Sequence, residues 1–274
     1  DGFEVAIQLL HPHLVVRPGT RERFRREAWL ASHVSPAYVA RVFEFGATPE
    51  GTEYIVMERL RGADLALVLE RRGRLTLEEV VPMVERIAEA LEAAHAVGIV
   101  HRDLKPENVF LAGDEDVRLL DFGVARHEAG AGLTLANEVL GTPGYMAPEQ
   151  ACGRPSDVGP HTDVFALGAI VYRCLTGRAA FPSRTACAAI YEAMHLVPEA
   201  PSSLVPELGP DIDIVVARAL AKASERRYPR ARAFAEELRR AATARRSGRR
   251  LIAFRGGVDA EDTKLERPNR ETAA

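Results

Sequence analysis

Residues 163–174 are apolar nearly all around a helical circumference, and this segment constrains the fold more than any other part of the sequence. A helix with apolar side chains on every face is stable in water only when other elements surround it. The chain has 274 residues, enough to build such a surrounding layer. We therefore predict a large, mostly helical domain with this segment at its centre.

The rest of this domain follows from periodicity and turn signals. Thr76 and Glu79 have the spacing of a capping box, so a long helix should begin after Thr76, and helical periodicity continues to Gly98. A hairpin and two more helices are predicted at residues 109–120, 211–222 and 231–243. Residues 61–243 are expected to form one lobe.

A smaller, β-rich lobe is predicted before it, at residues 1–60. Three strands are predicted at residues 3–10, 39–46 and 53–58, and one helix at residues 21–34. The segment 244–274 has too little apolar content to fold alone, so we expect a polar linker.

Composition excludes several classes of protein. The net charge of −3 provides no basic field for nucleic acid, so no such partner is expected. Cys152, Cys174 and Cys187 are far apart, without the spacing of a zinc site or a disulfide framework. No apolar run is long enough to span a bilayer and no signal peptide opens the chain, so a cytoplasmic protein is expected.

Three motifs carry chemistry. Residues 101–108 read His-Arg-Asp-Leu-Lys-Pro-Glu-Asn, residues 121–123 read Asp-Phe-Gly, and residues 141–149 read Gly-Thr-Pro-Gly-Tyr-Met-Ala-Pro-Glu. In this order and spacing they resemble the eukaryotic-type serine/threonine protein kinase family, especially its bacterial Hanks-type members. The resemblance covers residues 5–238 and implies an α+β, two-lobed protein-kinase-like fold.

The resemblance also implies a set of roles in phosphoryl transfer from ATP. Asp103 would accept the substrate hydroxyl proton or orient the hydroxyl, and Lys105 would neutralise charge on the transferred group. Asn108 and Asp121 would hold Mg²⁺, which prefers hard oxygen ligands and keeps several waters.

A nucleotide pocket is implied in the same way. The segment from Met57 through Glu58 to Leu60 resembles the hinge whose backbone binds adenine, with Ala6 above the ring and Phe110 below it. The alternative for Ala6 and Phe110 is core packing, and both can hold because core residues line such a slot. Asp64 is expected to meet the ribose.

Regulatory residues complete the resemblance. Arg102 matches the arginine that docks a phosphorylated activation loop, with Thr134 as the phosphosite; an unmodified loop threonine is an equal alternative. Lys105 and Thr142 match residues that mark serine/threonine specificity. Glu149 and Arg227 are expected to form a structural ion pair.

The chain departs from the family pattern at one position of the first predicted strand. The family reads Val-Ala-Ile-Lys where residues 5–8 read Val-Ala-Ile-Gln, so Gln8 replaces the lysine that would pair with phosphates and with Glu27. Losing the interaction between this lysine and a phosphate charge would raise the activation free energy of phosphoryl transfer by up to about 4 kcal/mol, which corresponds to about a thousandfold in rate. The family's Gly-rich loop would lie before residue 1, so we expect an N-terminally truncated domain.

Three functions stay open. A serine/threonine kinase with protein substrates, and with a homodimer for autophosphorylation, is favoured by Asp103, Asn108 and Asp121. A pseudokinase that binds or scaffolds is favoured by Gln8 and the missing loop. Small-molecule phosphotransferases share a similar catalytic loop, but residues 141–149 argue against that class.

Overall fold

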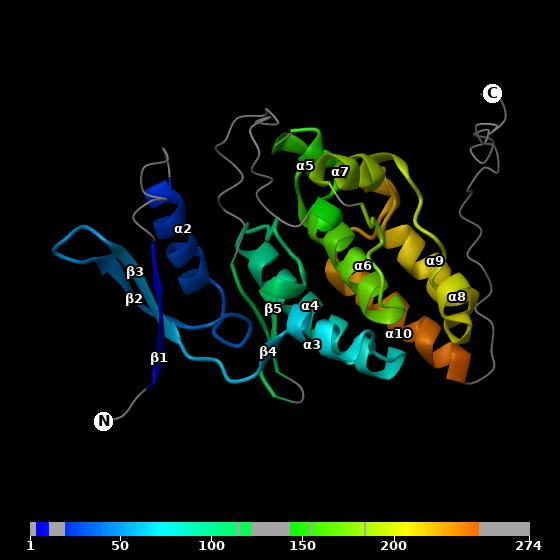
Figure 1. Cartoon of the computed structure of the whole chain (residues 1–274), viewed down its shortest axis with the longest axis horizontal. Coiled ribbons are helices and arrows are strands. Elements are labelled where there is room, and N and C mark those ends of the chain that lie inside the picture. The colour runs from blue at the N-terminus through cyan, green and yellow to red at the C-terminus, as the bar shows by residue number, and fades with distance from the viewer. Residues whose placement is uncertain are drawn as a thin grey trace, which may run out of the picture.

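Helix α6 (Pro160–Thr176) lies at the centre of the larger lobe, as its apolar sequence predicts (Figure 1). The described residues of this computed structural model are 4–10, 20–113, 116–121, 143–153, 155–183 and 185–246. All residues of α6 from position 162 to position 172 are buried. The helix begins three residues before the predicted start because Pro160 suits a first helical turn.

Other helices surround α6. Helices α4 (Leu77–Ala96), α9 (Gly209–Ala219) and α10 (Ala231–Arg246) all contact it, and all three were predicted. Helix α10 continues three residues into the segment expected to be a linker. Four further α-helices lie in the part of this lobe that the structure describes: α3 (Leu65–Arg72), α5 (Pro148–Ala151), α7 (Ala186–His195) and α8 (Pro201–Leu204).

The predicted capping box is present at the start of α4. The backbone N–H of Thr76 donates to the Glu79 carboxylate at 2.9 Å. Arg72, in the last turn of α3, adds two hydrogen bonds to the same carboxylate, at 2.7 and 3.0 Å. The Glu79 carboxylate therefore joins the end of α3 to the start of α4.

Over its described residues, the smaller lobe is a three-stranded antiparallel sheet with one helix, as predicted. Its strand order is β1 (Val5–Leu9), β3 (Glu53–Glu58) and β2 (Val42–Ala47). Helix α2 (Thr20–His33) packs on one face of the sheet (Figure 1). The buried cluster that joins them is small and consists of Leu10, Phe24, Ala28 and Ile55.

Strand β1 forms one edge of this sheet within the described part of the chain. Its alternation leaves Val5, Ile7 and Leu9 exposed, whereas Ala6 and Gln8 are partly buried on the opposite face. Gln8 lies opposite Ile55 in the sheet register, so its side chain is directed to the α2 side of the sheet.

A second small sheet lies between the lobes. It contains β4 (Ala63–Asp64), β5 (Val109–Leu111) and β6 (Val117–Leu119), and the last two strands form the predicted hairpin. The backbone N–H of Leu119 donates to the carbonyl oxygen of Tyr38 at 2.8 Å, which ties the hairpin to the segment after α2. Among the described residues, no helix is both long and apolar enough for a membrane span.

Candidate active site

The segment 101–108 follows α4 and is anchored on the first turn of α6. The buried carboxylate of Asp163 accepts backbone N–H bonds from His101 at 2.9 Å and from Arg102 at 2.8 Å. Nε2 of His95, in the last turn of α4, lies 2.7 Å from the same carboxylate. Burial opposes ionisation of Asp163, but these bonds together lower its pKa. A charged Asp163 therefore fixes the backbone at the start of the loop.

Two non-glycine residues of the site have left-handed backbone conformations. The φ angle is 66° at Arg102 and 49° at Asp121. Such conformations are unfavourable for residues with a Cβ atom and persist where the surroundings hold them. Gln150 donates to the carbonyl oxygen of Arg102 at 2.8 Å, and Nε2 of the buried His101 lies 3.1 Å from the carbonyl oxygen of Leu120, next to Asp121. Burial lowers the pKa of His101, which keeps its ring neutral.

Three of the predicted residues lie together in the loop. Nζ of Lys105 is 3.3 Å from Oδ2 of Asp103, and both side chains are about one-fifth exposed. Nδ2 of the buried Asn108 donates to the backbone oxygen of Asp103 at 2.8 Å and lies 3.4 Å from Oδ2 of the same residue. A carboxylate, an ammonium group and an amide thus converge at a partly exposed position.

The fourth predicted residue, Asp121, is brought beside this group by the hairpin. The backbone N–H of Leu120 donates to the backbone oxygen of Asn108 at 2.9 Å. Because the amide nitrogen of Asn108 is directed to Asp103, its side-chain oxygen is left as an acceptor. One amide oxygen and one carboxylate are hard ligands that suit Mg²⁺. The described residues contain no cluster of three or more His, Cys, Asp or Glu side chains fit for a metal ion.

Gln8 and Asp121 line one small cavity between the lobes. Met57, Ile55 and Ala28 contribute to its apolar wall, and its volume is about 40 Å³. This space is far smaller than a nucleotide, so it does not define a nucleotide-binding pocket. It does show that Gln8 and Asp121 lie on the walls of the same cavity. The side chain of Glu27, the expected partner at this position, lies outside the described residues.

The residues predicted to contact adenine lie on both sheets, with Ala6, Met57 and Glu58 on the first and Phe110 on the second. Ala6 pairs with Met57 across β1 and β3, and the next residue, Glu58, ends β3. The Glu58 carboxylate is 3.7 Å from Nη1 of Arg118 on the hairpin, so it joins the two sheets. Leu60 follows in the segment between the lobes.

Phe110 and Asp64 lie opposite each other in β5 and β4. Oδ1 of Asp64 accepts the backbone N–H of Leu67 at 2.8 Å, which makes Asp64 the N-cap of α3. The sequence reasoning missed this capping role and helix α3 itself. The signal was present, because an aspartate just before a leucine-rich segment is a typical helix start.

The regulatory predictions differ in outcome. Thr134 and Thr142 lie outside the described residues, whereas Arg102 lies in the anchored loop. The predicted ion pair between Glu149 and Arg227 is confirmed, with two hydrogen bonds of 2.8 Å between nearly fully buried side chains.

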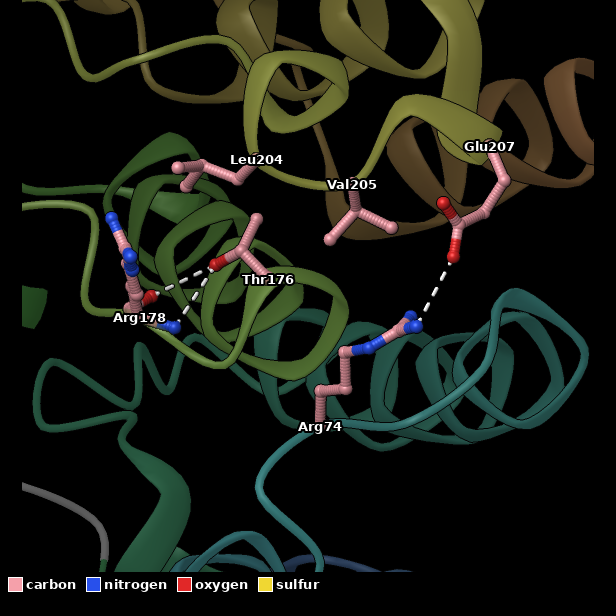
Figure 2. A pocket seen from close by; sticks show the side chains of 6 residues that line it. All are labelled: Arg74, Thr176, Arg178, Leu204, Val205 and Glu207. Atoms are coloured by element: carbon pink, nitrogen blue, oxygen red, sulfur yellow. Dashed lines mark hydrogen bonds and ion pairs between the residues drawn. The ribbon is translucent and has the colours of Figure 1, made fainter.

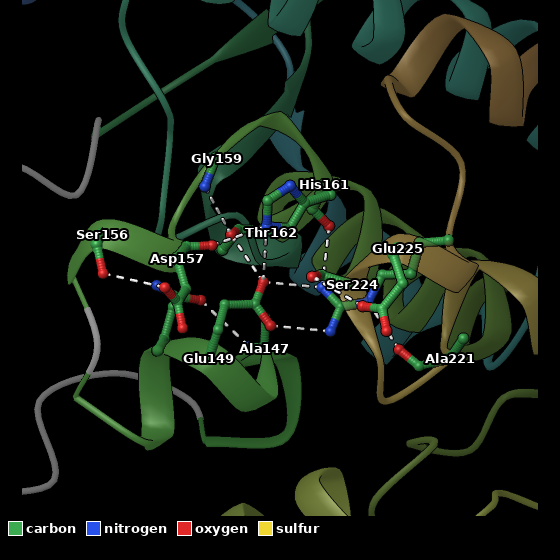
Figure 3. A network of polar contacts seen from close by, with 12 residues as sticks. Ala147, Glu149, Ser156, Asp157, Gly159, His161, Thr162, Ala221, Ser224 and Glu225 are labelled. Atoms are coloured by element: carbon green, nitrogen blue, oxygen red, sulfur yellow. Dashed lines mark hydrogen bonds and ion pairs between the residues drawn. The ribbon is translucent and has the colours of Figure 1, made fainter.

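This ion pair belongs to a wider polar network (Figure 3). The hydroxyl of Thr162 donates to Oε1 of Glu149 at 2.8 Å, and Nε2 of His161 lies 3.8 Å from the same oxygen. Desolvation opposes the charge on Glu149, but the bonds from Arg227 and Thr162 lower its pKa overall. The network fastens the end of the third motif to the first turn of α6.

Comparison with known proteins agrees with this geometry. Residues 4–240 match the family described as "Protein kinase domain". The chain is 36% identical over 248 residues to a probable serine/threonine-protein kinase PknB of Corynebacterium glutamicum, a match covering 87% of this chain and 38% of that protein. It is 36% identical over 253 residues to serine/threonine-protein kinase PknA of Mycobacterium tuberculosis, covering 91% and 57%. The chain thus spans between about two-fifths and three-fifths of the length of these two relatives.

A solved structure also resembles the chain. The PknI kinase domain of Mycobacterium tuberculosis superposes with a TM-score of 0.69 at 28% sequence identity, covering 87% of this chain and 85% of that one. Its kinase fold agrees with the predicted two-lobed α+β architecture. The sequence motifs, the anchored loop and these likenesses agree, and the chain belongs to the protein kinase domain family.

Proposed function

We propose that this chain is a serine/threonine protein kinase domain that transfers the γ-phosphoryl group of ATP to protein hydroxyls. The observation that carries the proposal is the convergence of Asp103, Lys105 and Asn108, with Lys105 3.3 Å from Asp103. Phosphoryl transfer needs positioning and charge neutralisation more than covalent chemistry, and this group supplies both.

The proposed roles follow from the chemistry of each side chain. Asp103 orients the attacking hydroxyl and accepts its proton, and Lys105 places a positive charge beside the transferred group. Asn108 and Asp121 are the proposed oxygen ligands for Mg²⁺, which neutralises phosphate charge when bound. Ala6, Met57, Glu58, Leu60 and Phe110 are the proposed adenine contacts, and Asp64 the proposed ribose contact.

Substrates and setting are part of the same proposal. The relatives are named serine/threonine-protein kinases, which supports serine and threonine hydroxyls of proteins as acceptors, with Thr142 as a specificity residue. Phosphorylation of Thr134 would provide a negative charge that Arg102 could bind. In a homodimer, one copy would transfer this phosphoryl group to Thr134 of the other. A cytoplasmic location fits an enzyme that draws on ATP.

The competing function is a binding module that has lost catalysis. Gln8 favours it, because glutamine brings no charge to the phosphates and lines the cavity beside Asp121. The relatives reported above are named as kinases, which favours the enzyme.

The deciding experiment is phosphate transfer from labelled Mg-ATP by the purified chain, onto itself and onto a generic basic protein. The matched control is Asp103→Asn, which keeps the shape of the side chain and removes its charge. We expect transfer above this control. Transfer equal to the control, with ATP binding retained, would instead establish the binding module.

A further inference from the structure

Arg102 is bonded on both sides of its backbone, and the two bonds come from different helices. Its N–H donates to Asp163 of α6 at 2.8 Å, and its carbonyl oxygen accepts Nε2 of Gln150 in α5 at 2.8 Å. The φ angle of Arg102 is 66°, in the left-handed region that residues with a Cβ atom rarely adopt. The two bonds therefore hold a backbone conformation that is unfavourable for Arg102 by itself.

The carbonyl group that Gln150 contacts belongs to the peptide bond between Arg102 and Asp103. A peptide unit is planar, so a bond to this carbonyl oxygen also restrains the direction in which the chain enters Asp103. On the other side of Asp103, Leu104 is only 1% exposed and packs in the apolar core. Asp103 is thus held between a bonded peptide unit and a buried leucine.

Both ends of the Gln150 amide are bonded. Oε1 accepts the backbone N–H of Ala147 at 3.2 Å, while Nε2 donates to Arg102. These contacts decide which end of the amide faces the loop, because only its nitrogen can donate to a carbonyl oxygen. The neighbouring residue, Glu149, is bonded to Arg227, so the helix that carries Gln150 is itself attached to the rest of the lobe.

We propose that Gln150 is a positioning residue for phosphoryl transfer, which holds the backbone at Arg102 so that the Asp103 carboxylate meets the substrate hydroxyl. This inference rests on the proposed function, in which Asp103 orients that hydroxyl. Without the bond, a partly buried carbonyl group loses its donor and the backbone at Arg102 can relax. Asp103 would then shift relative to the transferred group, and small displacements of a reacting group slow a reaction strongly.

Two variants separate the loop contact of Gln150 from its contact within α5. At pH 7.5, Gln150→Glu keeps the shape of the side chain and an oxygen for the N–H of Ala147, but it has no N–H for the carbonyl group of Arg102. Gln150→Met has nearly the same length and makes neither bond. A residue that only capped α5 would tolerate Gln150→Glu, whereas a positioning residue tolerates neither variant.

Thr176, the last residue of α6, provides a control for general loss of stability. Its hydroxyl donates to the backbone oxygen of Tyr172 at 2.7 Å and accepts the backbone N–H of Arg178 at 3.1 Å, beside a cavity of about 240 Å³ (Figure 2). Thr176 lies about 20 Å along the helix from Asp163. Thr176→Val therefore removes comparable hydrogen bonds without touching the loop.

The first measurement does not require kinase activity. Amide hydrogen exchange of His101 and Arg102, whose N–H groups donate to Asp163, is followed by NMR in the full chain. Relative to amides in the middle of α6, both Gln150 variants should exchange about three- to tenfold faster at these two positions, as expected for the loss of one hydrogen bond. Thr176→Val should leave this ratio as it is in the parent.

The second measurement is steady-state transfer from Mg-ATP. Both Gln150 variants should lower kcat about ten- to a hundredfold, as expected for a misplaced reacting group. KM for ATP should change less than about twofold, because the proposed adenine contacts lie on other elements. Thr176→Val should keep the kcat of the parent.

Unchanged exchange at His101 and Arg102 in both Gln150 variants would overturn the inference whatever the transfer assay shows. Faster exchange with the kcat of the parent would overturn it as well, because the loop backbone would then not govern transfer. A parent without transfer activity would contradict the proposed function separately, and faster exchange in both variants would still support the role of Gln150 in holding Arg102.

Discussion

Nη2 of Arg25 lies 2.9 Å from Oε1 of Glu53, a carboxylate whose side chain is only 1% exposed. The arginine belongs to α2 and the glutamate to β3, so this contact fastens the helix to the sheet. Since Gln8 carries no charge, it cannot provide an ionic tie between β1 and α2. Together with the small cluster around Phe24, the Arg25–Glu53 pair therefore holds α2 in place.

We expect Arg25→Met to destabilise the chain by roughly 1–3 kcal/mol, since it leaves a buried carboxylate without its cation and Arg25 itself is partly solvated. The double variant Arg25→Met, Glu53→Gln should recover part of that loss. Urea unfolding followed by far-UV circular dichroism measures both. A single variant as stable as the parent would show that water compensates Glu53.

Gln8→Lys should raise catalytic efficiency with ATP. The new ammonium would lie in the inter-lobe cavity beside Asp121, where phosphate charge is proposed to gather. The upper limit of the gain is about a thousandfold, from a unit charge contact at about 4 Å. Steady-state kcat/KM measures it, and Gln8→Met serves as the uncharged control. Equal values for all three proteins would show that position 8 does not contact the phosphates.

Arg227→Met should be strongly destabilising, by about 3–5 kcal/mol, because the side chains of Arg227 and Glu149 are 0% and 8% exposed. Adding Glu149→Gln removes the stranded charge and should restore part of the stability. Thermal or urea unfolding measures the three proteins. If the double variant is no more stable than Arg227→Met, the arginine acts mainly through its bonds to backbone carbonyls.

The Glu79 carboxylate at the start of α4 should make the free energy of unfolding depend on pH. The hydrogen bonds from Arg72, then that from Thr76, lower the pKa of Glu79 from 4.5 to about 2. A carboxylate whose pKa is lowered in the folded state stabilises the fold fully when the pH is above its pKa in the unfolded chain. This contribution is lost as the pH falls through the folded-state pKa of about 2. Glu79→Gln should therefore flatten the decline in unfolding free energy between about pH 5 and pH 2. Parallel declines for parent and variant would contradict this.

The sequence predicted most of the larger lobe because its signals are local. The apolar circumference of α6, the capping box at Thr76 and the hairpin before Asp121 each need only neighbouring residues. Helices α3, α5, α7 and α8 were missed. Helix α3 is short, and its N-cap is Asp64, to which a ligand role had been given.

The geometry of the candidate site could not be predicted from the sequence, although the structure brings the predicted residues Asp103, Lys105 and Asn108 together. The left-handed backbone at Arg102 is held by the bond from Gln150 and by the anchoring on Asp163, which lie far away in the sequence. Next to Asp121, the carbonyl oxygen of Leu120 is contacted by the ring of His101. Single-residue preferences disfavour such conformations for arginine and aspartate. Long-range contacts therefore decide the shape of the loop, and a motif cannot encode them.

The small cluster of Leu10, Phe24, Ala28 and Ile55 has a kinetic consequence. Regions with few buried apolar contacts open locally at a lower free energy than the whole fold, and their amide hydrogens exchange earlier. Amides of α2 should therefore exchange with solvent well before those of α6, and the Arg25–Glu53 contact would break in the same event. Ala28 and Ala31 of α2 line the inter-lobe cavity, so this side of the cavity should open in the same event.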